Sequence, residues 1–177
     1  MRKSFVFLAT VVGLLLSLTV KSHAQPQAGS VPARDFKATR DIKIISSAGA
    51  RALADACAAW AEQNKQILAI AILDWGGNLI ESHAMEGAAM NSIDTALLKA
   101  KSALRWRRPT SETNQMVRSG QNLAPTFMND FPQPGALPIV VDGQVVGAMG
   151  VSGADGEKCA QAAIDKVFDK RATSSGR

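Results

Sequence analysis

The sequence predicts an α+β fold in which helices pack on one antiparallel sheet. Two stretches carry this prediction, "AILDWGGNLI" (residues 71–80) and "IVVDGQVVGA" (residues 139–148). Each joins an apolar run to a second run through a short turn that contains aspartate and glycine, and turns this short connect antiparallel neighbours. Helical patterns before, between and after the two hairpins supply the layers that cover the sheet.

The individual elements follow from hydrophobic periodicity. A helix is predicted from about Ser46 to Asn64, because Leu53, Cys57 and Ala61 recur at the spacing of one helical face. Continuous β-branched runs predict buried strands. The order is α-β-β-α-α-β-β-α, which is a PAS/profilin-like arrangement. The further expected elements are strands over 67–74 and 79–85, a helix from Ser92 that ends before Pro109, a short helix over 110–120, a proline-rich loop over 121–138, a hairpin around Asp142-Gly143 and a last helix from about Asp155.

The first 24 residues have the pattern of a secretory signal peptide. Arg2 and Lys3 precede the uncharged apolar run Phe5–Val20, and Ser22 and Ala24 are small residues at the two positions that signal peptidase reads. The apolar run is shorter than the roughly 20 residues that a membrane span needs. We therefore expect cleavage after Ala24, a periplasmic or secreted protein, and no membrane span in the mature chain.

A single domain is expected after the signal peptide. Residues 25–43 are polar and lack a period, which predicts a loose arm; the domain is expected over 44–170 and a C-terminal tail over 171–177. The net charge of +5 at pH 7 comes partly from the signal peptide, so it gives no reason to expect a nucleic-acid partner. Cys57 and Cys159 would face an oxidising compartment, and both a disulfide between them and two buried free thiols remain open.

The glycine-rich stretch "GAMGVSG" (residues 147–153) is not a nucleotide-binding loop. Its spacing is G-x-x-G-x-x-G, it follows a hairpin strand, and no Gly-Lys-Ser/Thr comes after it. Glycines within a strand instead indicate that a neighbour approaches the backbone closely. We therefore expect Met149, Gly150 and Ser152 to border a flat or bulky ligand.

Two blocks of the chain, residues 71–103 and 134–153, resemble the haem-degrading domain family. That family includes GlcG-like and HbpS-like proteins and the C-terminal domain of PduO-type adenosyltransferases. The resemblance extends over about Ile44 to Phe168 and implies a PAS/profilin-like domain that forms homo-oligomers and, in some members, binds haem. The residues that carry it are Asp74, Gly77, Gly87-Ala88, Ser92, Lys99-Ala100, Gly135, Asp142-Gly143 and Gly150-Val151-Ser152-Gly153.

Few side chains are candidates for chemistry. His83 is the one histidine that remains after cleavage, so it is the candidate metal ligand, for haem iron, or else an acid–base group. The first-helix histidine with which some PduO-type members hold haem has no counterpart here. Met85 and Met149 offer thioethers that either ligate iron or fill the core, and Lys99 offers a cation for a carboxylate such as a propionate. Ser152, Thr110, Ser111 and Asp74 are further candidates, for a polar pocket.

Three functions remain open at this point. The first is an exported oligomeric protein that binds a small molecule, with haem as the leading ligand and with haem degradation or haem sensing as its role. The second is an enzyme that acts on a small organic acid or metabolite and uses Lys99 and His83. The third is a non-catalytic accessory protein that binds a partner.

Overall fold

A computed structural model describes residues 41–168 of the chain. The predicted signal peptide, most of the arm and the C-terminal tail lie outside the described residues. Within that range no helix is long and apolar enough to cross a membrane. The elements are α1 (Ser47–Gln63), β1 (Ala69–Asp74), β2 (Leu79–Ala84), α2 (Ser92–Trp106), α3 (Thr110–Arg118), α4 (Ala124–Phe127), β3 (Ala136–Val141), β4 (Gln144–Ser152) and α5 (Gly156–Val167).

The four strands form one antiparallel sheet in the order β2-β1-β4-β3, which confirms the predicted α+β class. The predicted order lacked one element, the single-turn helix α4, which lies in the segment expected to be a loop. Pro125 stands in the first turn of α4, where a missing N–H costs nothing, so a proline that reads as a loop signal here begins a helical turn.

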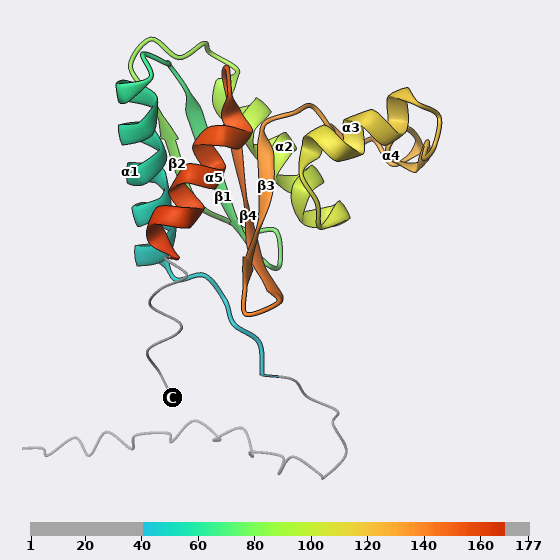
Figure 1. Cartoon of the computed structure of the whole chain (residues 1–177), viewed down its shortest axis with the longest axis horizontal. Helices are drawn as coiled ribbons and strands as arrows, with labels where there is room; N and C mark the ends of the chain where they lie inside the picture. The colour runs from blue at the N-terminus through green and yellow to red at the C-terminus, as the bar shows by residue number, and fades with distance from the viewer. Residues whose placement is uncertain (1–40, 169–177) are drawn as a thin grey trace, which may run out of the picture. The chain divides into compact units, whose positions relative to one another are not determined.

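Helices cover both faces of the sheet (Figure 1). Helices α1 and α5 lie side by side on one face, and α2 packs on the other. The alternation of β1 serves both layers: Ile70 and Ile72 belong to the core under α1 and α5, and Leu73 belongs to the smaller core under α2. This explains why β1 reads as a continuous apolar run instead of an alternating one.

The aspartates of the two hairpins shape their turns, as expected. In the β3–β4 turn, Asp142 and Gly143 both have positive φ angles, 48° and 76°, which is the geometry of a type I′ turn. In the β1–β2 turn, the Asp74 carboxylate accepts hydrogen bonds from the side-chain amide and the backbone N–H of Asn78, both at 2.8 Å. The side-chain hydrogen bond from Asn78 is the main reason that the pKa of Asp74 is lowered.

The close neighbour of Gly150 is helix α2. A Cβ atom at this position would collide with the carbonyl oxygen of Ala96 and lie 2.7 Å from the backbone nitrogen of Ala100. We expected the glycines of β4 to leave room for a flat ligand, but at Gly150 the helix backbone takes that room. The alanines of α2 let the helix axis come close to the sheet.

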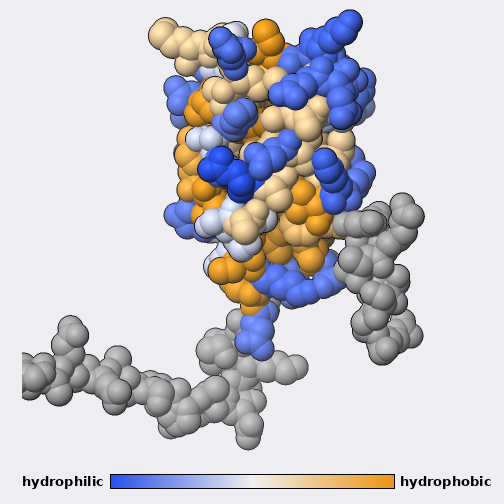
Figure 2. All heavy atoms as spheres, turned by 90° about the vertical axis from the view of Figure 1, so that its left-hand side faces the viewer, coloured by the Kyte–Doolittle hydropathy of each residue, from blue (hydrophilic) through white to orange (hydrophobic). Residues whose placement is uncertain are grey.

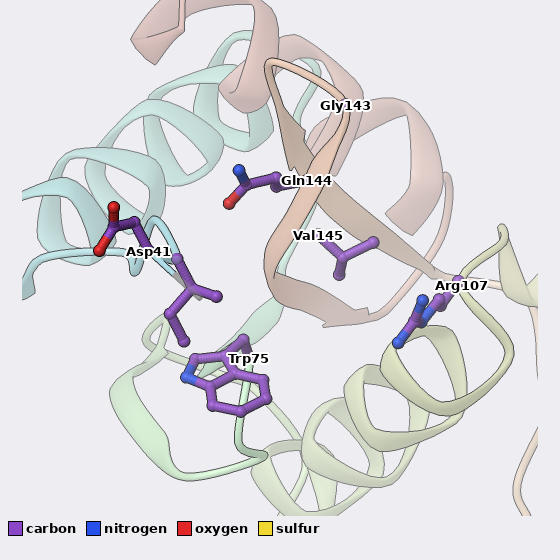
Figure 3. Close-up of a pocket in the computed structure, with 7 residues that line it drawn as sticks. Asp41, Trp75, Arg107, Gly143, Gln144 and Val145 are labelled. Atoms are coloured by element: carbon purple, nitrogen blue, oxygen red, sulfur yellow. The ribbon is translucent and has the colours of Figure 1, made fainter. Parts of the chain in front are cut away.

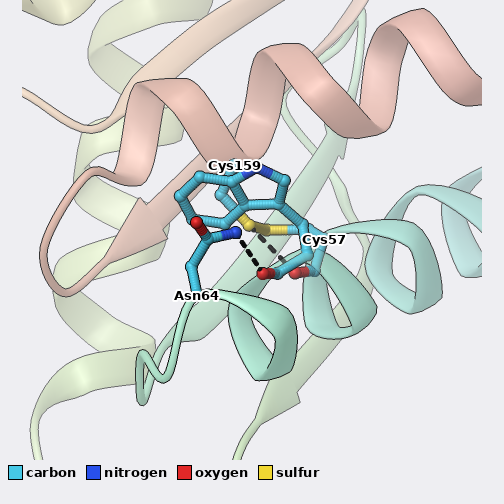
Figure 4. The surroundings of a disulfide bond; sticks show 4 residues. Cys57, Asn64 and Cys159 are labelled. Carbon is cyan, nitrogen blue, oxygen red and sulfur yellow. Dashed lines mark hydrogen bonds between the residues drawn. A yellow bond between two sulfur atoms is a disulfide. The ribbon is translucent and has the colours of Figure 1, made fainter.

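A disulfide joins Cys57 of α1 to Cys159 of α5 (Figure 4). The two Cα atoms lie 5.2 Å apart and both side chains are fully buried, so of the two alternatives left open by the sequence the structure has the bridge. The side-chain amide of Asn64 donates to the carbonyl of Trp60 at 2.7 Å at the end of α1. The two helices on this face are thus joined covalently as well as by packing.

We expect the disulfide to stabilise the fold strongly. The bridge spans a sequence separation of 102 residues. Closing a loop of that length lowers the entropy of the unfolded chain, which in the chain-entropy model stabilises the folded state by up to about 4–5 kcal/mol. The double variant Cys57→Ala/Cys159→Ala should lose free energy of unfolding on that scale in urea titrations. Reductant should destabilise the wild type and leave the double variant unchanged; a wild type indifferent to reductant would show that no bridge forms.

Gly150→Ala tests the close approach of α2. We expect it to lower the free energy of unfolding by about 1–3 kcal/mol, because the new methyl group overpacks against helix backbone that has no rotamer to change. Gly150→Val should cost more. Gly49→Ala is the matched control, since its Cβ would lie 3.4 Å from the Ser46 hydroxyl and the change favours the helix. Equal melting temperatures for Gly150→Ala and the wild type would contradict the packing described here.

Candidate functional site

Strand β2 places His83 on the face of the sheet that α1 covers. In the register of the sheet His83 pairs with Ile70, and Glu81, on the same face, pairs with Ile72. Arg51 of α1 reaches over this strand to the Glu81 carboxylate at 3.0 Å. The His83 ring is half-buried, and it makes no hydrogen bond or ion pair with any other residue between 41 and 168. Its nitrogens are therefore free to bind a ligand.

Met85 follows His83 at the end of the same strand. Its backbone N–H donates to the carbonyl of Leu68 at 3.0 Å, which continues the pairing of the two strands. Its half-buried side chain packs on the core under α1 and α5. The fold therefore brings Met85 and His83 to one side of β2, as strand periodicity predicts for residues two apart. Beyond them, Met90 is fully exposed before α2 begins.

Lys99 is buried within the layer between α2 and the sheet. Only 7% of the residue is exposed, and its ammonium group donates to the carbonyl of Val151 at 3.2 Å. Burial lowers the pKa of Lys99, and the nearby negative charge of Glu157 opposes that shift. The ammonium group lies against Gly135, where an added Cβ would come within 2.8 Å of it. Lys99 thus connects α2 to the end of β4 and to the start of β3 from inside the protein.

Glu157, in the first turn of α5, is the polar centre of this region. Its carboxylate accepts hydrogen bonds from the backbone N–H and the hydroxyl of Ser111, at 2.8 and 2.7 Å. It also receives the hydroxyl of Thr110 at 3.1 Å and the N–H of Gly135 at 3.3 Å. Thr110 in turn accepts from the N–H of Ala136 at 2.9 Å. Of the polar pocket expected from Ser152, Thr110, Ser111 and Asp74, only Thr110 and Ser111 share this carboxylate, and the Asp74 carboxylate instead holds Asn78 in the β1–β2 turn.

The other candidates on β4 are dispersed. Met149 is fully buried in the core under α1 and α5, whereas Gly150 lies on the opposite face beneath α2. Ser152 is half-buried at the end of the strand, in register with Ala69. The six candidates therefore do not form one site: His83 and Met85 lie together, Lys99 lies inside, and the β4 residues are divided between two faces.

A cavity opens at the end of the sheet that carries both hairpin turns, opposite the end where His83 lies (Figure 3). Its volume is about 610 Å³. Its members come from four separate segments that share no sequence pattern, although a tryptophan in a hairpin turn was a signal. The lining residues are Asp41, Ile42, Trp75, Arg107, Gly143, Gln144 and Val145.

The described residues offer few ligands for a bare metal ion. No group of three or more histidine, cysteine, aspartate or glutamate side chains converges between residues 41 and 168. His83 is the one histidine in that range. Among the described side chains His83 therefore offers the one imidazole that could hold a haem iron.

The chain matches one protein-family model. The model described as "Haem degrading protein HbpS-like" covers residues 45–167. An uncharacterised 15.0 kDa protein of Citrobacter freundii, encoded in the dhaT–dhaS intergenic region, is 31% identical over 134 residues, which is 72% of this chain and 94% of that protein. Protein GlcG of Escherichia coli K12 is 35% identical over 109 residues, 62% of this chain and 81% of that protein.

Solved structures share the fold. ORFY of Klebsiella pneumoniae superposes with a TM-score of 0.70 at 29% identity and covers 76% of this chain and 97% of its own. A double mutant of HbpS from Streptomyces reticuli gives 0.68 at 28% identity, with 80% and 98% covered. A complex of PduOC with haem gives 0.65 at 24% identity, with 72% and 96% covered, a likeness of fold alone.

The buried position of Lys99 predicts a pH dependence of stability. Because its pKa is lower in the folded than in the unfolded chain, the unfolded chain binds more protons as the pH rises from neutral toward 10.5, and stability rises in that window. Urea titrations at pH 7 and pH 10 should show the free energy of unfolding of the wild type rising relative to that of Lys99→Met. Lys101→Met, which removes an exposed lysine from the same helix, is the control; a difference between wild type and Lys99→Met that stays flat with pH would refute the assignment.

Proposed function

Since this chain belongs to the HbpS-like haem-degrading family, we propose that it is an exported haem-binding protein that assembles into homo-oligomers. The observation that carries the proposal is the position of His83. This imidazole is half-buried on an edge strand and has no partner among residues 41–168, so either ring nitrogen is available to iron. Met85 lies two residues further along the same face, and its thioether suits both iron and an apolar macrocycle.

Two features on this side of the molecule support the proposal of a large planar ligand at His83. The side of the molecule where α1 and β2 lie in Figure 1 faces the viewer in Figure 2, and it exposes apolar patches between hydrophilic side chains. Arg51 stands on this side and is 62% exposed, so its guanidinium can exchange Glu81 for a propionate at modest cost. Bound haem would supply a redox-active iron, and the protein would supply an axial nitrogen, apolar contacts and a cation.

Export is supported by two independent features. The first is the sequence pattern of residues 1–24, which is typical of a cleaved signal peptide. The second is the buried disulfide between Cys57 and Cys159, because such bonds persist in oxidising compartments. A periplasmic or secreted protein satisfies both.

Assembly is supported by apolar side chains that the single chain leaves uncovered. Helices α3 and α4 extend away from the sheet (Figure 1), and three side chains at α4 remain exposed to solvent. Monomeric proteins rarely expose large apolar side chains in a cluster, and such clusters mark interaction surfaces. The residues are Leu123, Phe127 and Met128, exposed by 48%, 84% and 52%.

Haemin titration of the purified protein tests the proposed function. We expect a saturable shift of the Soret band, and His83→Ala should weaken haemin binding by on the order of tenfold or more, equivalent to about 1.4 kcal/mol. Ser82→Ala is the control, because Ser82 is the neighbouring residue on the opposite face of the same strand. A wild type without a saturable Soret shift would refute haem binding. An unchanged spectrum and affinity in His83→Ala would refute only the assignment of the ligand.

A further inference from the structure

The cavity between the two hairpin turns is remote from His83 along the sheet. His83 pairs with Ile70 near the start of β1, whereas Trp75 follows the end of β1 and Gly143 precedes β4. The residue that pairs with Asp74 at that end is Gly147. The cavity is thus a separate feature of the molecule, with its own lining and its own chemistry.

Its walls are largely apolar, and they are exposed. Trp75 keeps 54% of its surface accessible and Ile42 keeps 47%, although both are large hydrophobic residues. Figure 3 shows the indole of Trp75 below the opening and Val145 across from it. An indole ring in such a position offers a flat face on which a planar group stacks.

One charge points into this space. Arg107 ends α2 with a left-handed backbone, φ 53°, and in Figure 3 its guanidinium is directed toward the cavity, whereas the Asp41 carboxylate points away from Trp75. The Arg107 side chain makes no hydrogen bond or ion pair with other residues of the described range 41–168. The amide oxygen of Gln144, by contrast, is occupied, because it accepts from the N–H of Lys43 at 3.0 Å.

The arm residue Lys43 holds this wall in place. Besides its hydrogen bond to Gln144, its ammonium group pairs with the Asp142 carboxylate in the β3–β4 turn. The end of the predicted arm is therefore fastened to the turn, and it brings Ile42 to the cavity. The charges of Lys43 and Asp142 at the rim are paired with each other, whereas the guanidinium of Arg107 is directed inward.

We propose that this cavity binds a small organic acid that has a planar, apolar body. A guanidinium pairs with a carboxylate through two parallel hydrogen bonds. Trp75 would stack on the body of the ligand, and Ile42 and Val145 would cover its edge. The volume of about 610 Å³ lies in the range of pockets that enclose small ligands. The site acts independently of haem bound at His83.

Benzoate and its uncharged isostere benzamide test the proposal on the ¹⁵N-labelled mature protein. The indole N–H resonance of Trp75, assigned by its loss in Trp75→Phe, and the amide of Gly143 should shift saturably with benzoate. Benzamide should bind at least about tenfold more weakly, because it offers the guanidinium one neutral carbonyl oxygen in place of the two oxygens of a charged carboxylate. Equal affinity for the two probes, or no shift at Trp75 with benzoate, would overturn the proposal.

Two variants of Arg107 separate binding from folding. Arg107→Gly removes the cation at a backbone angle that glycine favours, so the melting temperature should be kept or raised. Arg107→Gln keeps the length of the side chain. Both should weaken benzoate binding by about tenfold or more, and Arg118→Gln, on α3, should leave it unchanged. Wild-type affinity in Arg107→Gly would overturn the proposal, as would displacement of benzoate by haemin, which would make the cavity part of the haem site.

Discussion

The Glu157 carboxylate holds together three segments that are distant in the sequence. It receives the N–H and hydroxyl of Ser111 at the start of α3 and the N–H of Gly135 just before β3, and it belongs itself to the first turn of α5. Without it, the N–H of Ser111 in the first turn of α3 and the N–H of Gly135 at the entry to β3 would lose their acceptor in a partly buried place. The position of α3 and α4, which otherwise extend from the sheet, depends on this group.

Lys99 is the counterpart of Glu157 across the end of β4. A buried ammonium group is costly unless it is paired, and here one carbonyl and one nearby carboxylate compensate it. Ser102, also on α2, adds a second anchor by donating to Asp130, a carboxylate that the indole N–H of Trp106 also reaches. Helix α2 is thus fixed by polar contacts from its middle and its C-terminal half, and by the close approach of Ala96 and Ala100 to Gly150.

The sequence predicted the elements of the fold well, because periodicity and turn chemistry are local. Continuous apolar runs and the short turns that contain aspartate and glycine were enough to place the hairpins, and the covering helices followed from their apolar faces. Local sequence patterns do not show which helix or strand packs against a given residue. The glycines of β4 correctly indicated a close neighbour, but only the packing of the layers identifies α2 as that neighbour at Gly150. Glu157 escaped notice because its partners lie more than 20 residues away.

The packing of the layers separates residues that stabilise the fold from residues that are accessible to a ligand. The interior of the sheet, with Met149, Gly150 and Lys99, is committed to packing and to the polar contacts that close it, so these residues are unavailable to a ligand unless the layers separate. Chemistry is left to the rims of the sheet. At one rim stands the His83 imidazole, whose ring has no partner between residues 41 and 168, and at the other a guanidinium beside an exposed indole. Since His83 lies on an edge strand and the indole lies in a hairpin turn, ligand binding at either rim would not require the two cores to open.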